Sequence, residues 1–168
     1  MLDAPCGDYN WFRLIVWKNE IDYIGGDIVK PLIESNQARY GGERTKFVLL
    51  DIVNDPLPEA ELWICRDCLF HFSERDIMLT INNFLKSNIR YLLTTSHPDC
   101  NINHDIPTGS FRPLNLQLPP YSFGQPVFRI NDWNKGWLAK HLVLWERETL
   151  KNRLALNKVF QSVVGQEN

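Results

Sequence analysis

The sequence predicts an α/β fold in which a mostly parallel β-sheet is covered by helices on both faces. Short apolar runs of strand length alternate along the chain with longer segments of helical pattern. In addition, each of the first three runs ends at an aspartate. Strands that are buried on both faces are apolar throughout, which is typical of parallel sheets with helices on both sides.

The first half of the chain contains three predicted strands and two predicted helices. The strands are residues 1–4, 23–27 and 47–51. Residues 11–17 carry apolar side chains on more than one face, which favours a buried helix. Residues 31–40 are predicted to form the second helix, because the proline at its start is tolerated in a first helical turn.

The alternation continues in the middle of the chain. Residues 62–65 and 90–95 are predicted strands. Between them, Ser73 is a suitable N-cap for a helix over residues 74–85, whose apolar residues fall on one face. The chain therefore continues the strand–helix–strand order of a parallel sheet.

The pattern changes in the last part of the chain. Residues 97–125 are rich in Asn, Pro and Gly, and the segment is too long for an ordinary connection, so we expect it to be functional. Residues 127–130 and 141–145 are predicted to form an antiparallel pair of strands at the end of the sheet. Residues 149–163 are predicted to form one terminal helix.

Composition limits the class of protein. The 168 residues fit a single domain, and 44% hydrophobic with 23% charged residues is ordinary for a soluble globular chain. A net charge of −2 does not favour nucleic-acid binding, and no apolar run is long enough to span a membrane. We expect a cytoplasmic protein, because no export signal is visible and four cysteines do not suggest a disulfide scaffold.

Three aspartates, Asp3, Asp27 and Asp51, end the first three predicted strands. Ligands of open α/β sheets bind beyond the carboxyl ends of the strands. A carboxylate in this position can accept hydrogen bonds from both hydroxyls of a ribose. The three acids together favour a nucleoside site, and the alternative is that they are ordinary loop-entry residues.

The loop after the first strand argues against a nicotinamide dinucleotide. The G-x-G-x-x-G fingerprint needs three glycines, and this loop supplies only Gly7. Asp8 would also repel a pyrophosphate at this position. A nucleoside ligand that carries no phosphate would tolerate this acidic, glycine-poor loop.

The segment Leu2-Asp3-Ala4-Pro5-Cys6-Gly7-Asp8 resembles the first motif of class I S-adenosylmethionine-dependent methyltransferases, D/E-x-G-x-G-x-G. When the two are aligned on Asp3, Pro5 and Gly7 stand at the first two glycine positions. Tyr9 stands at the third.

Four later segments extend the resemblance over nearly the whole chain. Residues 23–27 (YIGGD) look like the second motif, whose acid binds the ribose, and residues 50–52 (LDI) look like the third, whose acid reaches the adenine amino group. Residues 62–72 (LWICRDCLFHF) look like the fourth, where the strand end faces the methionine portion and the acceptor. Residues 111–116 (FRPLNL) are similar to a segment in a bacterial subgroup whose substrates are often unassigned.

The resemblance implies a Rossmann-like class I methyltransferase fold with an antiparallel C-terminal strand. It implies methyl transfer from S-adenosylmethionine to a small-molecule or glycan acceptor. Residues 1–168 would form one methyltransferase domain without the N-terminal segment by which family members usually cover the cofactor. The residues implied to contact the cofactor are Asp3, Gly7, Asp27, Ile28, Asp51, Ile52 and Arg66.

Two residues after the fourth strand are the candidates for catalysis. Transfer from a sulfonium mainly needs orientation of the reactants, and an oxygen acceptor often also needs a base. Asp67 and His71 are the nearest candidates for that base. The alternatives are that Asp67 caps the following turn and that His71 packs against Phe70 and Phe72.

Weaker candidates lie in the long loop. They are His97, Asp105 and Arg112. Arg112 could bind an acidic acceptor through two parallel hydrogen bonds, although a structural salt bridge is the favoured interpretation.

Two other interpretations of the sequence compete with a metal-free methyltransferase: a zinc site and a non-catalytic binding module. Cys65, Cys68, His97 and Cys100 could be imagined as a zinc set. We predict no metal site, because Cys65 falls within a buried strand, where a thiol behaves as a small apolar group. The other interpretation is a non-catalytic, degenerate binding module that keeps the sheet without the activity.

Overall fold

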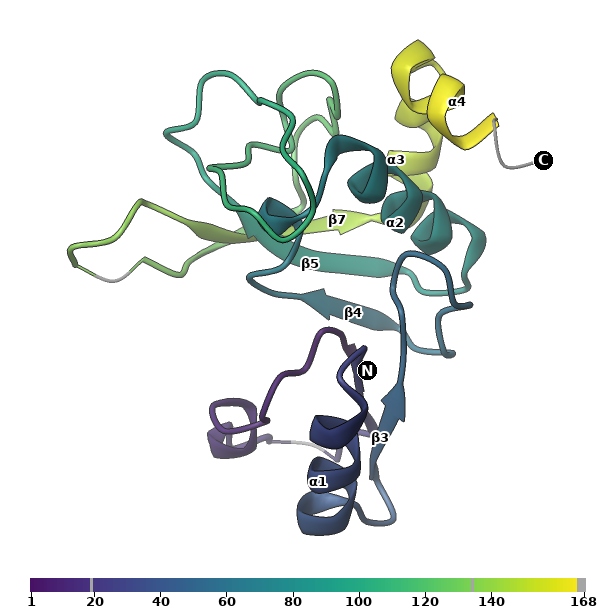
Figure 1. The fold of residues 1–168 in the computed structure, drawn as a ribbon, viewed down its shortest axis with the longest axis vertical. Helices are drawn as coiled ribbons and strands as arrows, with labels where there is room; N and C mark the ends of the chain where they lie inside the picture. Colours follow the sequence, from purple (N-terminus) through teal and green to yellow (C-terminus); the bar gives the residue numbers. More distant parts are fainter. Residues whose placement is uncertain (19, 134, 166–168) are drawn as a thin grey trace.

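The computed structural model describes residues 1–18, 20–133 and 135–165, and it contains one seven-stranded sheet (Figure 1). The order of the strands across the sheet is β3-β2-β1-β4-β5-β7-β6. The first five strands pair in parallel, and β7 is antiparallel to both of its neighbours. This confirms the predicted mostly parallel sheet with its antiparallel C-terminal pair. In chain order the strands are β1 (Leu2–Asp3), β2 (Tyr23–Asp27), β3 (Thr45–Leu49), β4 (Leu62–Cys65), β5 (Tyr91–Ser96), β6 (Phe128–Asn131) and β7 (His141–Glu146).

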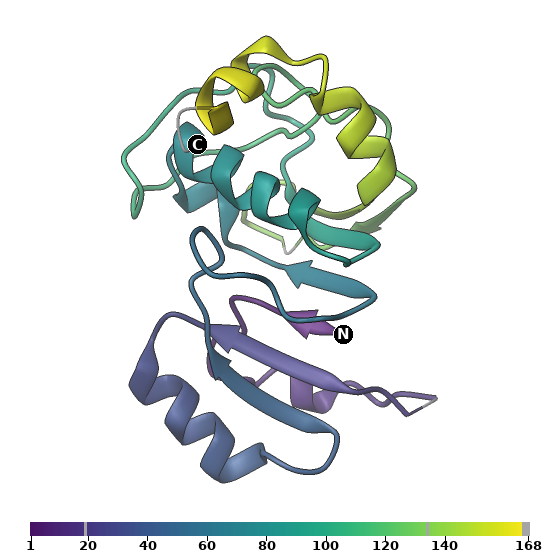
Figure 2. The same ribbon diagram turned by 90° about the vertical axis from the view of Figure 1, so that its right-hand side faces the viewer.

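The helices fall into two groups. One group is α1 alone, which packs on β2 and β3 near one end of the sheet. The other group is α2, α3 and α4, in which α2 contacts both α3 and α4 near the opposite end (Figures 1 and 2). The α-helices are α1 (Lys30–Tyr40), α2 (Glu74–Lys86), α3 (Arg147–Leu154) and α4 (Lys158–Val164), and the short 3-10 helices are η1 (Phe12–Leu14) and η2 (Leu69–His71).

The two groups cover opposite faces of the sheet. Trp63 of β4 packs in the same core as Ile77 and Phe84 of α2. The next residue, Ile64, packs instead in the core that contains Ile33 of α1. Because successive strand residues point to opposite faces, α1 and α2 lie on different sides of the sheet. This confirms that the sheet has helices on both faces.

The start of α2 is also confirmed. The hydroxyl of Ser73 accepts a hydrogen bond from the backbone N–H of Asp76 at 3.1 Å, so Ser73 is the N-cap. The buried residues of α2 include Ile77, Ile81 and Phe84, which the sequence places on one helix face. This helix therefore forms as the sequence predicts.

The predicted buried helix over residues 11–17 is wrong. Only η1 forms there, and Ile15 ends it with an extended conformation (φ −74°, ψ 121°). Phe12 is buried, whereas Leu14 is 68% exposed and Val16 is 92% exposed. The apolar residues of this segment thus do not share one buried face, and a single anchor residue does not sustain a helix.

The predicted single helix over residues 149–163 is also wrong. The structure has two helices, α3 and α4, separated by residues 155–157. The side chain of Asn157 accepts hydrogen bonds from the backbone N–H groups of Val159 and Phe160 and so starts α4 as an N-cap. The break lets α4 bury Phe160 in the same core as α2.

The third strand lies two residues earlier than predicted. The prediction of residues 47–51 missed Thr45 and Lys46, which pair with Tyr23 and Ile24 of β2. The chain leaves the sheet after Leu49. As a result, Asp51 lies in the loop beyond the strand, on the side where ligands of such sheets bind.

The long segment between β5 and β6 has no helix or strand over residues 97–127. It is nevertheless held in place by four buried apolar side chains, Leu114, Leu116, Tyr121 and Phe123. Within the part of the chain that the structure describes, no helix is long and apolar enough to span a bilayer.

Candidate active site

Two adjoining cavities lie at the carboxyl ends of the parallel strands. The small cavity has a volume of about 270 Å³, and its lining includes Pro5, Ile28, Asp51 and Ile52. The large cavity has a volume of about 610 Å³ and is lined by Arg66, Asp67, Phe70, His71, His97, Phe111, Trp137, Leu138 and Lys140. Asp67 and His71 line both cavities. These two residues therefore mark the boundary between the cavities.

The loop after β1 is fixed by Asp27, at the end of β2. One carboxylate oxygen of Asp27 accepts the backbone N–H of Gly7 at 3.1 Å, and the other accepts that of Val29 at 3.0 Å. The carbonyl of Gly7 accepts from the buried side chain of Asn36 at 2.8 Å. Gly7 has a φ of +56°, which L side chains rarely adopt, so glycine is needed for this turn.

Tyr9 also adopts a left-handed conformation, with a φ of 61°. It stands where the resembled motif has its third glycine, so the chain keeps a backbone shape that favours glycine. Its ring packs against Tyr23 and Tyr40, with centroid distances of 4.9 and 5.4 Å. This packing holds the bulky residue in place.

Asp3 is buried beneath the loop. Its carboxylate accepts a hydrogen bond from the hydroxyl of Tyr23 at 2.8 Å. Burial raises the pKa of Asp3 to about 7, although the Tyr23 hydrogen bond and the charge of Arg66 both act to lower it. Asp3 thus supports the loop from inside the protein and does not line either cavity.

Asp51 fixes the loop beyond β3. Its two carboxylate oxygens accept from the backbone N–H of Val53 at 2.9 Å and from the side chain of Asn54 at 2.8 Å. Each oxygen has a second lone pair and can accept another hydrogen bond. Asp51 therefore lines the small cavity as a positioned acceptor.

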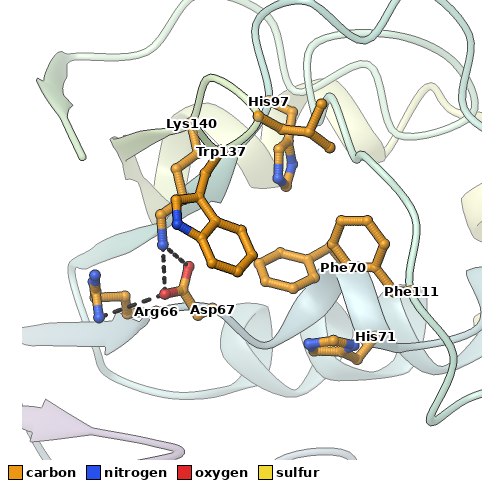
Figure 3. A pocket seen from close by; sticks show the side chains of 9 residues that line it. Arg66, Asp67, Phe70, His71, His97, Phe111, Trp137 and Lys140 are labelled. Carbon is orange, nitrogen blue, oxygen red and sulfur yellow. Dashed lines mark hydrogen bonds and ion pairs between the residues drawn. The ribbon is translucent and has the colours of Figure 1, made fainter. Parts of the chain in front are cut away.

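Asp67 takes part in a network of four charges. Lys140 Nζ lies 2.7 and 2.6 Å from its two carboxylate oxygens, and Arg66 lies 3.4 Å from one of them (Figure 3). Arg66 also binds Asp132 through two hydrogen bonds, at 3.0 and 3.2 Å. Because cations already occupy both oxygens of Asp67, its carboxylate is poorly suited to take a proton from an acceptor.

His71 is better placed to act as a base. Its Nδ1 lies 2.8 Å from the carbonyl oxygen of Ser110. A carbonyl only accepts hydrogen bonds, so in the neutral ring Nδ1 carries the hydrogen and Nε2 has the free lone pair. His71 also packs against Phe70 and Phe111, with centroid distances of 4.5 and 5.9 Å.

The three weaker candidates in the long loop have structural partners. His97 is buried, its Nδ1 accepts the backbone N–H of Leu114 at 3.1 Å, and burial lowers its pKa. Arg112 donates to the carbonyl of Phe70 and to the hydroxyl of Tyr121, both uncharged. The carboxylate of Asp105 accepts the backbone N–H groups of two residues, Glu74 and Ile106.

Solved structures share this fold, although no protein-family model and no curated protein sequence matches the chain. Magnesium protoporphyrin IX methyltransferase from Synechocystis PCC 6803, with bound S-adenosylhomocysteine, aligns with a TM-score of 0.63 and 13% identity over 87% of this chain and 73% of that one. The 1,6-didemethyltoxoflavin-N1-methyltransferase from Burkholderia thailandensis aligns with a TM-score of 0.65 and 14% identity, over 86% of this chain and 69% of its own. Human N-acetylserotonin methyltransferase aligns with a TM-score of 0.62 and 13% identity over 86% of this chain. The chain spans only 46% of the length of that enzyme.

The chain has the class I methyltransferase fold. At these identities the likeness concerns the fold alone.

Within this methyltransferase fold, the sequence-predicted site residues separate into three groups. Ile28, Asp51 and Ile52 line the small cavity, together with Asp67 and His71. Arg66 lines the large cavity. Asp3, Gly7 and Asp27 line neither cavity and build the loop beside the small one.

Sequence reasoning missed five residues that line the large cavity. They are Phe70, Phe111, Trp137, Leu138 and Lys140. Lys140 contacts Asp67 across 73 positions in the chain, so no local pattern links the two. Of these residues, only Phe70 and Phe111 could have been suspected from the sequence, because they lie in residues 62–72 and 97–125, two segments that were expected to be functional.

The cysteines of the C-x-x-C segment are buried. Cys65 and Cys68 both carry free thiols, and burial and the neighbouring Cys68 raise the pKa of Cys65. Across residues 1–18, 20–133 and 135–165, no group of three or more His, Cys, Asp or Glu side chains is arranged to hold a metal ion.

Proposed function

We propose that this protein transfers a methyl group from S-adenosylmethionine to a small-molecule acceptor. The observation that carries the proposal is the meeting of the two cavities at Asp67 and His71. One cavity would hold the nucleoside and the other the acceptor, so the reacting groups would meet at these residues. The neighbours crystallised with S-adenosylmethionine, S-adenosylhomocysteine or 1,6-didemethyltoxoflavin support this division.

The residues around the small cavity suit S-adenosylmethionine. Ile28 and Ile52 would hold the flat adenine ring by apolar contact, and Asp51 would accept from its amino group. Asp27 directly precedes Ile28 and has lone pairs left for the ribose hydroxyls. The loop carries the exposed carboxylate of Asp8 and so suits a ligand without phosphates.

The chain would contribute orientation and proton acceptance. S-adenosylmethionine supplies a methyl group on a sulfonium. The neutral ring of His71 would accept the proton of a hydroxyl acceptor at Nε2, with Nδ1–H held by Ser110. Lys140 and Arg66 would hold Asp67 at the boundary of the cavities. We further propose one domain over residues 1–168 and a location in the reducing cytoplasm, which the four free thiols support.

The cofactor half is tested first by calorimetric titration with S-adenosylhomocysteine beside NAD. Binding of the former alone is expected. The Asp27→Ala variant is expected to bind S-adenosylhomocysteine at least tenfold more weakly (about 1.4 kcal/mol), because it loses the ribose acceptor and frees the Gly7 loop.

The matched control for this test is Glu59→Ala, an exposed acid away from both cavities, which is expected to leave the affinity unchanged. An unchanged affinity in a folded Asp27→Ala variant would remove Asp27 from the site. Binding of NAD in place of S-adenosylhomocysteine would overturn the proposed function.

The role of His71 is tested with an asparagine variant. The amide N–H of asparagine can replace Nδ1–H toward the carbonyl of Ser110, but the side chain has no lone pair to take a proton. His71→Asn is expected to slow methyl transfer to a hydroxylated acceptor at least 100-fold, at the lower end of the range of about 10²–10⁴ for a lost base. Single-turnover transfer of a labelled methyl group measures this rate.

Because His71 also lines the small cavity, the affinity for S-adenosylhomocysteine is measured in the same variant, and the rates are compared at saturating S-adenosylmethionine. A rate equal to that of the wild type would show that His71 has no part in proton transfer.

A further inference from the structure

We infer that the large cavity binds a flat, uncharged aromatic molecule with one hydroxyl group, stacked between Trp137 and the rings of Phe70 and Phe111. This inference deepens the proposed function, because it names the class of acceptor. It rests on the shape of the walls, the balance of charge and the number of free hydrogen-bonding groups.

One wall of the cavity is a packed set of rings. Phe70 meets His97 at 5.2 Å and 76°, and it meets Phe111 at 5.5 Å and 79°. These edge-to-face contacts are the preferred geometry for aromatic pairs. Phe70 and His97 are buried. The wall is therefore formed before any ligand binds.

The opposite wall comes from the connection between β6 and β7. Trp137 and Leu138 line the cavity from this side although they are 79% and 54% exposed. Figure 3 shows the indole of Trp137 facing Phe70 and Phe111 across the cavity. The backbone at Trp137 is held by a hydrogen bond of 2.6 Å from the indole N–H of Trp133. A flat ring in this slot would cover apolar surface that is otherwise exposed to water.

The charges at the edge of the cavity balance one another. Arg66 and Lys140 are both paired with Asp67 and Asp132. Two cations therefore face two carboxylates, and a ligand carboxylate or phosphate would have to displace one of them. His97 adds no charge, because its Nδ1 accepts the backbone N–H of Leu114 and therefore carries no hydrogen, and burial also lowers its pKa. This balance favours an uncharged ligand.

The free hydrogen-bonding capacity of the described lining is small. A sugar ring exposes several hydroxyls and needs several partners, but most polar groups here are already engaged. Asp67 and Lys140 bind each other, Arg66 binds Asp132, and Nδ1 of His97 binds Leu114. Nε2 of His71 remains as an acceptor, and in the neutral ring of His97 Nε2–H remains as a donor, which together match the O–H and the lone pair of one ligand hydroxyl.

The probe for this inference is 2-naphthol, a flat and uncharged aromatic alcohol. It is titrated by calorimetry into the protein with and without S-adenosylhomocysteine, beside two comparison probes. One is 6-hydroxy-2-naphthoate, which adds a carboxylate to the same rings, and the other is methyl glucoside, which presents a sugar. We expect 2-naphthol to bind at least tenfold more tightly than either of them.

Two variants locate the binding in the cavity. Trp137→Ala is expected to weaken 2-naphthol binding at least tenfold, whereas Trp137→Phe, which keeps a stacking ring, should change it less than threefold. Neither variant is expected to alter the affinity for S-adenosylhomocysteine, because Trp137 does not line the small cavity. The inference would be overturned if methyl glucoside or 6-hydroxy-2-naphthoate bound more tightly than 2-naphthol. It would also be overturned if Trp137→Ala left the affinity for 2-naphthol unchanged.

The two titrations separate the two claims. Failure of S-adenosylhomocysteine to bind contradicts the proposed function, while 2-naphthol alone still tests the class of ligand. If 2-naphthol does not bind while S-adenosylhomocysteine is bound, the proposed class of acceptor is contradicted, and the proposed binding of S-adenosylmethionine still stands.

Discussion

Replacing Trp63 with alanine is expected to lower the free energy of unfolding by about 5 kcal/mol. Trp63 lies in the middle of the sheet on β4 and has no exposed surface. Its ring packs near Phe84 of α2, with centroids 6.0 Å apart, and its indole N–H donates to the carbonyl of Ala4 at 2.9 Å. The substitution would leave a cavity between sheet and helix and an unpaired carbonyl at the start of the cofactor loop. Urea unfolding followed by circular dichroism measures the loss.

Two variants control for this result. Trp63→Phe keeps most of the apolar volume and loses only the hydrogen bond, so a loss of about 2 kcal/mol is expected. Trp137→Ala removes a tryptophan that is 79% exposed and should change the free energy by less than about 0.5 kcal/mol. Equal losses from the Trp63→Ala and Trp137→Ala variants would contradict the packing described for β4.

Asp3 is expected to make the stability of the protein depend on pH. Its pKa is about 7 in the folded protein, against an ordinary 3.8, mainly because the carboxyl is buried. The folded state therefore holds this proton more tightly than the unfolded state. Its contribution is fully present below about pH 4 and is lost as the pH rises to about 7. The difference in pKa corresponds to about 4 kcal/mol.

The Asp3→Asn variant isolates this contribution. Asparagine does not titrate, and its carbonyl can still accept the hydroxyl of Tyr23. The free energy of unfolding of the wild type, relative to the variant, is expected to fall by about 4 kcal/mol between pH 4 and pH 8. Urea unfolding at several pH values measures it, with the exposed Glu59→Gln variant as the control that keeps the behaviour of the wild type. A difference that stays constant with pH would contradict a buried, protonated Asp3.

The sheet was predictable because its signal is local. Each parallel strand is a short apolar run, and β4 and β2 have the predicted bounds, Leu62–Cys65 and Tyr23–Asp27. The N-cap at Ser73 could be predicted for the same reason, because Asp76, whose backbone N–H donates to the Ser73 hydroxyl, lies only three residues away. The order of the strands across the sheet was not predicted, because it depends on which strands pair over long distances in the chain.

The two wrong helices fail for different physical reasons. Residues 11–17 are apolar, but apolar composition does not say whether a segment is covered, and only Phe12 finds a core to join. In the C-terminal segment the sequence did contain a signal. Asn157 is a favoured N-cap residue in the middle of the predicted helix, and it marks the start of α4.

The candidate site was predictable at the small cavity and at its boundary with the large one. Asp51, Asp67 and His71 follow strand ends in chain order, so the topology of a parallel sheet brings them to one edge. Trp137 and Lys140 reach the same edge because β7 runs antiparallel to β5 and returns the chain to the site. Their position depends on long-range pairing, which no window of sequence reveals.

The two cavities that meet at Asp67 and His71 also draw on different parts of the chain. All described residues that line the small cavity lie within residues 5–72. The large cavity, in contrast, takes five of its lining residues from residues 97–140, namely His97, Phe111, Trp137, Leu138 and Lys140. Sequence change in the second stretch can therefore reshape the large cavity while the residues that line the small cavity stay the same. Under the proposed function, a library confined to residues 97–140 would vary the acceptor and keep the methyl donor.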